Sequence, residues 1–227
     1  MNPIDSRIPR AFTLIELLAA TAIAGILAAL LAAGISGYFQ QARQLQCTAL
    51  LRNIGLAVQS YSQENQNEFP RSSHNAWALG KEPWGQALLP YLASAAPTNA
   101  DETWFFERFR CPADTRTGST IRSYALNVFF QLGPGDIYKG APTTWLTVPS
   151  VPRPATTVLV AENRGAADHF MCHQWTTAKG ASNAVDTLRH HQRSNYLFVD
   201  GHVEALPLNA TFDPKESLNR WNPGLAR

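Results

Sequence analysis

The residues best suited to chemistry lie near the C-terminus, where the sequence contains His190, His191, Asp200 and His202. Asp200-Gly201 separates two runs with strand character and predicts a hairpin with a type I′ turn, which would bring the flanking side chains together. Imidazole and carboxylate groups are common ligands of divalent metals. We therefore consider a metal site made of these four residues. The simpler interpretation, which we favour, is that His190 hydrogen-bonds the backbone or Asp200 and pins the hairpin.

Other candidates for chemistry are sparse. Asp168, His169 and His173 form a small cluster whose histidines have i, i+4 spacing, but Gly165 and the polar context do not favour a helix there. Glu162 ends an apolar run, where it would serve as an acid/base residue or as a strand-end cap. The sequence contains no Gly-x-Ser-x-Gly, no phosphate-binding Gly-rich loop and no His-Glu-x-x-His. We therefore expect no enzymatic activity, and no cofactor apart from the metal considered above.

Three cysteines, Cys47, Cys111 and Cys172, allow one disulfide and one spare thiol. We expect Cys47 to pair with Cys111 and so to tie a Cys-Pro loop to a helix. Pairing of Cys111 with Cys172, or three free thiols, remain alternatives. The sequence has no Cys-x-x-Cys, which argues against a zinc ribbon or a thioredoxin-like site.

A lone carboxylate, Glu16, stands at the start of an apolar segment. The run from Leu17 to Gly37 contains no charged residue and is long enough to cross a bilayer core of about 30 Å as a helix. A carboxylate at the centre of a bilayer costs roughly 2.5–3.5 kcal/mol on insertion scales, so it usually has a partner and a function. Arg7 and Arg10 precede the span and should stay in the cytoplasm, which places the rest of the chain outside.

The composition limits the remaining possibilities. In 227 residues, a membrane segment leaves room for one soluble domain of ordinary size, and 15 Pro and 14 Gly indicate a loop-rich domain. The net charge of +2 and the lack of a Lys/Arg-rich run do not support a nucleic-acid partner. A secretory signal peptide fits poorly, because the predicted helix continues well past the apolar run.

The elements that position these residues follow from periodicity. The helix should continue to about Glu64, with an apolar stripe on its water-exposed half. A short helix is predicted over 84–93, a polar loop over 94–103, and strands over 121–130, 156–161, 194–199 and 202–206. From Pro207 onward we expect a loosely held tail anchored by Phe212 and Trp221. The predicted stripe consists of Tyr38, Ala42, Leu45, Ala49, Ile54, Ala57, Val58 and Tyr61.

The N-terminus resembles that of type IV prepilins and type II secretion pseudopilins. A short polar leader, a small residue, the string Phe-Thr-Leu-Ile-Glu and an apolar helix together carry this resemblance. It implies that a prepilin peptidase cuts between Ala11 and Phe12 and methylates the new amine. It also implies that Glu16 pairs with the amine of a neighbouring subunit during assembly. Ala11 departs from the glycine usual at that place in the family, although a small residue is kept.

The rest of the chain resembles pilin-like proteins with a His-x9-Asp-Gly C-terminal domain. The resemblance rests on Leu51-Arg52-Asn53-Ile54-Gly55-Leu56-Ala57, Phe69-Pro70, Leu88-Leu89-Pro90-Tyr91-Leu92, Cys111-Pro112-Ala113-Asp114, Ser123-Tyr124-Ala125-Leu126-Asn127, and His190 with Asp200-Gly201. It implies an α+β fold in which a long N-terminal helix packs on a small antiparallel sheet that ends in a hairpin. The expected divisions are a leader (1–11), a membrane and assembly helix (12–37), an amphipathic continuation (38–66) and a globular pilin-like domain (67–227).

The favoured function is that of a structural filament subunit, a pilin or a pseudopilin. Its expected partners are a prepilin peptidase, copies of itself or other pilins, an inner-membrane assembly platform and the lipid bilayer. We expect a single pass through the cytoplasmic membrane, with a surface or periplasmic filament once assembled. The alternatives are a plain membrane anchor carrying a metal- or polymer-binding domain, or a metal-dependent hydrolase. Polymer binding would use exposed tryptophans among Trp77, Trp84, Trp104, Trp145 and Trp175.

Overall fold

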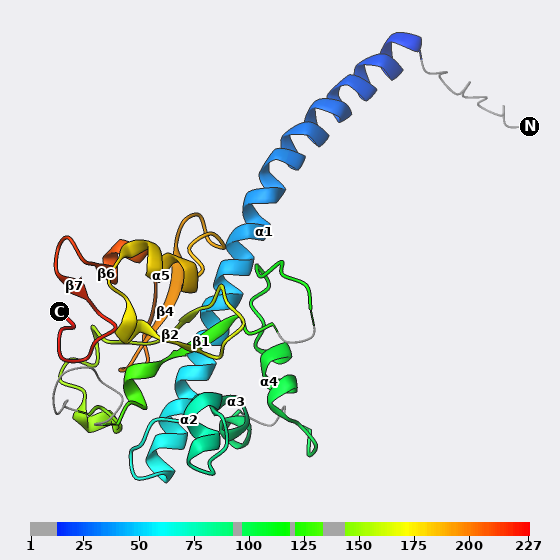
Figure 1. The fold of residues 1–227 in the computed structure, drawn as a ribbon. Coiled ribbons are helices and arrows are strands. Elements are labelled where there is room, and N and C mark those ends of the chain that lie inside the picture. The colour runs from blue at the N-terminus through cyan, green and yellow to red at the C-terminus, as the bar shows by residue number, and fades with distance from the viewer. Residues whose placement is uncertain (1–12, 93–96, 119–120, 134–143) are drawn as a thin grey trace, which may run out of the picture. The chain divides into compact units, whose positions relative to one another are not determined.

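The computed structural model describes residues 13–92, 97–118, 121–133 and 144–227 (Figure 1). For residues 32–36 it describes the backbone alone. The chain divides into two compact units, Met1–Ala42 and Arg43–Arg227. The predicted leader, Ala11 and Phe12 lie outside the described residues, as do Ala93 and residues 94–96 of the predicted loop.

One helix, α1 (Leu14–Glu64), contributes to both units. In the first unit every side chain that the structure describes is exposed. The segment Leu14–Leu31 is long and apolar enough to cross a membrane. The helix ends at Glu64, as predicted, and Gln66 and Asn67 then take φ angles of 55° and 61°, which an α-helix cannot continue.

The second unit is built on a five-stranded sheet of order β3-β1-β2-β4-β5, which confirms the α+β class. All pairs are antiparallel except β1 with β3, so the sheet is mixed and not purely antiparallel as expected. A two-stranded sheet, β6-β7, completes the β structure of the described residues. The strands are β1 (Tyr124–Asn127), β2 (Val158–Glu162), β3 (His169–Phe170), β4 (Ser194–Phe198), β5 (Val203–Leu206), β6 (Phe212–Asp213) and β7 (Leu218–Asn219).

The second half of α1 packs against this sheet through a different stripe from the one predicted. Its fully buried face contains Cys47, Leu51, Ile54 and Val58, at spacings of four, three and four residues. The predicted members Ile54, Ala57 and Val58 are buried and Tyr61 is partly buried, but Tyr38, Ala42, Leu45 and Ala49 are exposed. That half of the prediction was wrong, because Leu45 and Ala49 stand two residues from Cys47 and so lie about 200° around the helix from it.

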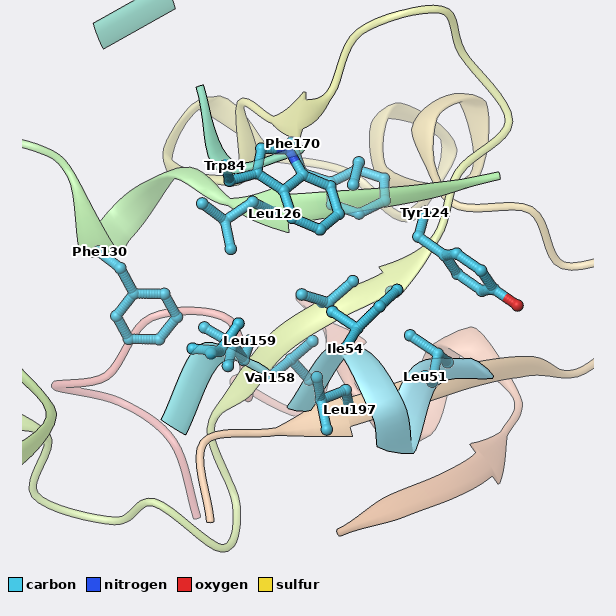
Figure 2. Close-up of a cluster of buried hydrophobic side chains, with 14 of the residues drawn as sticks. Leu51, Ile54, Trp84, Tyr124, Leu126, Phe130, Val158, Leu159, Phe170 and Leu197 are labelled. Atoms are coloured by element: carbon cyan, nitrogen blue, oxygen red, sulfur yellow. The ribbon is translucent and has the colours of Figure 1, made fainter. Parts of the chain in front are cut away.

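Gly55 explains how closely the helix approaches the sheet. A Cβ built on Gly55 would meet Leu197 Cδ1 of β4 at 2.8 Å. The helix therefore lies so close to β4 that any larger residue at this position would force the Leu197 side chain to shift. Figure 2 shows Leu51 and Ile54 in the same apolar cluster as Val158 of β2 and Leu197 of β4.

The described residues also form several short helices. They are α2 (Ser73–Ala78), α3 (Trp84–Ala87), α4 (Glu102–Arg108) and α5 (Ala178–Ala184), with 3-10 turns η1 (Leu89–Tyr91), η2 (Val128–Phe130), η3 (Val148–Ser150), η4 (Cys172–Gln174) and η5 (Leu208–Ala210). The helix predicted over 84–93 is therefore split into α3 and η1. Pro90 explains the split, because it has no N–H to continue the α-helical hydrogen bonds.

Two other local predictions need correction. The loop predicted over 94–103 already contains the start of α4, whose cap Asp101 accepts a hydrogen bond from Trp104 N at 2.9 Å. The strand predicted over 121–130 covers only β1, because the Asn127 side chain accepts from Phe129 N at 2.9 Å and starts η2. In both places a side-chain cap decides the boundary.

The C-terminal hairpin is confirmed as β4 and β5, but its turn is not of type I′. Gly201 N donates to Phe198 O at 2.9 Å, and Gly201 has a φ of 94°. Asp200 has no positive φ, which a type I′ turn would require at that residue. The geometry is instead that of a four-residue turn closed by a glycine bulge.

The segment after Pro207 is held firmly, contrary to the expectation of a loose tail. It contains η5, β6 and β7, and Val158 N of β2 donates to Arg220 O at 2.9 Å. The predicted anchors are confirmed, since Trp221 is fully buried and Phe212 nearly so. Trp221 also packs edge-on against Tyr196 of β4 with ring centroids 6.0 Å apart. Because neighbouring residues of a strand face opposite sides, Tyr196 points away from Leu197, and the C-terminal segment covers the sheet face opposite α1.

Candidate functional site

Glu16 is held at the start of α1 by Thr13. Thr13 N and Thr13 Oγ1 donate to Glu16 Oε2 at 2.9 and 2.8 Å, and Glu16 N donates to Thr13 Oγ1 at 3.3 Å. This reciprocal pair is a capping box, which satisfies backbone N–H groups at a helix start. The signal Thr-x-x-Glu is visible in the sequence, but our sequence reasoning missed it. A structural role for Glu16 therefore stands beside the predicted role in assembly, which stays a prediction.

The disulfide predicted between Cys47 and Cys111 is confirmed. The two Cα atoms are 5.1 Å apart, and both side chains are completely buried. Tyr124 Oη donates to Cys47 O at 3.2 Å, so β1 also contacts α1 at this point. Cys172 is free, and burial raises the pKa of its thiol to about 12. That thiol is therefore inert at neutral pH.

His190 pairs with Glu162 beside this disulfide. His190 Nε2 lies 2.8 Å from Glu162 Oε1, and both side chains are buried. Asn195 N donates to Glu162 Oε2 and Asn195 Nδ2 to Glu162 Oε1, each at 3.0 Å. Glu162, the last residue of β2, therefore joins β2 to the start of β4. His190 pins this end of the hairpin, but through Glu162 and not through Asp200.

The other end of β4 holds the Asp-Gly turn. Asp200 Oδ1 lies 2.6 Å from His202 Nδ1, and both residues are exposed. Asp200 O accepts from Gln59 Nε2 of α1 at 3.3 Å. His191 is exposed with a φ of 53°. A strand of five residues is about 16 Å long, so His190 and Asp200 lie at opposite ends of β4. The structure does not bring His190, His191, Asp200 and His202 together, so its geometry gives no support to a metal site made of these four, which stays an untested hypothesis.

The spacing in His-x9-Asp-Gly has a structural explanation. Along α1 the rise from Cys47 to Gln59 is about 18 Å, close to the length of β4. The disulfide with the Glu162–His190 pair fastens one end of β4 to the helix. The turn and Gln59 fasten the other end. The motif therefore fixes β4 along the helix at two points.

Asp114, in Cys-Pro-Ala-Asp, organises a second buried network. Its carboxylate contacts Arg116 at 2.6 Å and Arg189 at 2.9 Å, and accepts from Ser123 Oγ at 2.7 Å. Burial opposes ionisation, but the hydrogen bond from Arg116 and the charge of Arg189 lower the pKa of Asp114 to about 2. The carboxylate is ionised at neutral pH and joins the loop after Cys111 to the segment just before His190.

Comparison with known families finds two matching stretches of the chain. Residues 7–32 match the family described as "Prokaryotic N-terminal methylation motif". Residues 40–165, more than half of the chain, match the family described as "Protein of unknown function (DUF1559)". The chain belongs to the DUF1559 family. No curated protein and no solved structure matched it.

These matches confirm the resemblance to prepilin-like proteins. In this DUF1559 chain the methylation motif ends and the family domain begins within one continuous helix, α1. The methylation motif supports pilin- or pseudopilin-type processing and assembly. The DUF1559 match includes Cys47, Cys111, Asp114 and Glu162 and stops before His190.

The remaining candidate residues of this DUF1559 chain, Asp168, His169 and His173, make contacts that hold the fold together. Asp168 accepts from Ser73 N and Ser73 Oγ at 2.7 and 2.9 Å and contacts His169 Nδ1 at 2.9 Å. Burial raises the pKa of Asp168, but the contacts with His169 and Ser73 bring it below its ordinary value. Asp168 thereby links β3 to the start of α2. His173 belongs to η4, where its ring lies 6.3 Å from that of Phe129.

The tryptophans do not form the polymer platform considered above. Trp84 and Trp145 are buried in the core, and Trp104 and Trp175 are partly buried against it. Trp77, in α2, is 73% exposed. A stacking surface for a polymer needs several exposed rings, so the tryptophans support packing and not polymer binding.

Proposed function

We propose that this chain is a structural subunit, a pilin or pseudopilin, of a type IV pilus or a type II secretion-like filament. The observation that carries the proposal is the methylation-motif match over residues 7–32 on the helix that continues into the DUF1559 domain. In such a subunit the exposed apolar half of α1 first anchors the chain in the membrane and then packs in the filament. Catalysis has no part in this function.

Processing is the first step of the proposal. A prepilin peptidase cuts between Ala11 and Phe12, removes the leader 1–11 and methylates the amine of Phe12. Arg7 and Arg10 keep the leader in the cytoplasm, and the globular domain lies on the other side of the inner membrane. A buried disulfide supports that location, because such bonds persist outside the cytoplasm.

Assembly is the second step and uses Glu16. The capping contacts from Thr13 hold the carboxylate at the first turn of α1. A neighbouring subunit displaced by about one helical turn, roughly 5.4 Å, would bring its Phe12 amine to this carboxylate. The pairing of the two charges offsets the cost of placing either in lipid. The partners are other copies or other pilins, brought together at an inner-membrane assembly platform.

Mass spectrometry of the native chain tests processing. The expected mature protein begins at Phe12 and carries one added methyl group. As a control, Ala11→Phe should block cleavage, because a bulky side chain replaces the small residue before the cut. A full-length chain in assembled filaments would contradict the proposal.

Imaging separates the two kinds of filament. Cells with a tagged copy are examined with and without their type II secretion machinery. Surface filaments that persist without the secretion machinery identify a type IV pilus subunit. Filaments that disappear with it identify a pseudopilus subunit. A tagged copy that stays dispersed in the membrane in every background would argue for a plain anchor.

A further inference from the structure

The structure places four metal-ligand side chains together in a buried group that the filament function does not use. Cys47, Cys111, Glu162 and His190 each offer a ligand atom, and these atoms all lie within 4.8 Å of one another. All four side chains are buried. The group lies where α1, the loop at Cys111 and strand β2 meet the segment before β4.

We propose that these four residues form a zinc site when Cys47 and Cys111 are reduced. Cys thiolates, His imidazoles and Glu carboxylates all bind Zn²⁺, and four such ligands complete a tetrahedral site. The site differs from the cluster considered from the sequence, since it shares only His190 with it. It also goes beyond the filament function, because a subunit needs no metal to assemble.

The interatomic distances suit zinc. With bonds of about 2.3 Å to sulfur and about 2.1 Å to nitrogen or oxygen, neighbouring sulfur and nitrogen or oxygen ligands of tetrahedral Zn²⁺ lie about 3.6 Å apart. Cys111 Sγ lies 3.6 Å from His190 Nε2 and 3.7 Å from Glu162 Oε1. Two contacts must open. The two sulfur atoms, 2.05 Å apart in the disulfide, must separate to about 3.8 Å, and the His190–Glu162 contact, at 2.8 Å, must open to about 3.4 Å.

The surroundings of Glu162 also suit a ligand. Asn195 donates to both carboxylate oxygens at 3.0 Å and so fixes the orientation of the group, as outer contacts do around many metal sites.

The zinc state and the disulfide state exclude each other. A disulfide oxidant, R–S–S–R, converts the zinc state into the disulfide state. The oxidant takes two electrons from the two zinc-bound thiolates, so its S–S bond breaks and the Cys47–Cys111 bond forms. Its two R–S⁻ groups take up two protons and leave as thiols, and Zn²⁺ is released. In either state α1 is cross-linked to the globular domain at the same place.

Metal binding by the full chain in detergent tests the proposal. The chain is reduced with a phosphine and titrated with Zn²⁺ against a chromophoric chelator. We expect one Zn²⁺ per reduced chain and no comparable site in the oxidised chain. Glu162→Gln and His190→Asn should each weaken binding at least about tenfold, since even outer contacts contribute 10–100-fold at zinc sites. His202→Asn and Cys172→Ala are the matched controls and should leave the affinity within about twofold.

A second measurement needs no variant. Co²⁺ bound to the reduced wild-type chain should show thiolate-to-cobalt charge-transfer absorption, and X-ray absorption of the Zn²⁺ form should show two sulfur and two lighter ligands. Re-formation of the disulfide on oxidation shows that each variant is folded. The proposal is overturned if the reduced chain does not bind Zn²⁺, if Cys172→Ala abolishes binding, or if Glu162→Gln and His190→Asn bind like the wild type.

Discussion

The two halves of α1 have the same secondary structure and opposite surroundings. Up to Ala42 every described side chain is exposed, and a Cβ added at Gly25 or Gly37 would meet nothing within 4 Å. After Arg43 the same helix carries a buried disulfide at Cys47 and a close contact at Gly55. The second half of the helix is thus buried along one face, whereas every described side chain of the first half is exposed.

This difference shows where each half obtains its stability. A helix in water depends mainly on packing of an apolar face, and the second half has that packing within the chain. The first half has an apolar surface all round, which suits lipid or the helices of other subunits. Substitutions in the first half should therefore affect assembly, and substitutions in the second half should affect folding.

The largest expected effect is at Glu16. Glu16→Gln and Glu16→Leu should abolish or severely reduce filaments while the globular domain stays folded and the chain stays in the membrane. Thr13→Val removes the hydroxyl contacts of the capping box and keeps the charge, so it should reduce filaments much less. Electron microscopy of sheared filaments and protease resistance of the domain measure the two properties. If Glu16→Gln assembled like the parent, the charge would have only a local capping role.

The disulfide should have the largest effect on folding. Replacing Cys47 and Cys111 together by serine should lower the free energy of unfolding by about 4 kcal/mol in the chain-entropy model. Urea unfolding of the full chain in detergent, followed by tryptophan fluorescence with a chelator present, measures this loss. Cys172→Ala is the control, and an equal loss in that variant would show that the stabilisation does not come from the cross-link.

Two glycines of α1 provide a matched pair. Gly55→Ala should destabilise the domain by about 1–3 kcal/mol, because the new methyl group would overlap Leu197 in a filled core. Gly37→Ala makes the same chemical change where the structure leaves open space, and should not lower domain stability. The same urea experiment compares them. Equal effects at the two positions would contradict the contrast between the two halves of the helix.

The smallest effect is a pH dependence at Asp114. Its pKa of about 2 in the folded chain is below the ordinary value of 3.8, so its contribution is present above about pH 4 and is lost as the pH falls toward 2. The loss should be about 2.5 kcal/mol at most, from about 1.4 kcal/mol per pKa unit. Asp114→Asn should remove this part of the pH dependence. Identical pH profiles for the two proteins, measured by urea unfolding, would contradict the assigned network.

Several elements could be predicted from local patterns. The end of α1, strand β2 and the β4-β5 hairpin follow from apolar periodicity and turn residues, which act over a few positions. The two-residue strand β3 and the firmly held C-terminal segment could not be predicted, because tertiary contacts and caps determine such short elements. The capping box is a further local feature, because the spacing of Thr13 and Glu16 in Thr-x-x-Glu is enough to predict it.

The sequence by itself determined the apolar span, the processing motif and the family, because each depends on residue types at fixed local spacing. The tertiary structure decided which face of α1 is buried and which side chains meet His190. Glu162 and His190 are 28 positions apart, and they meet because β2 pairs with β4 in the register Ala161 with Tyr196. Such a register depends on how the whole core packs, so it decides that His190 lies beside the disulfide and that Asp200 lies at the far end of the strand.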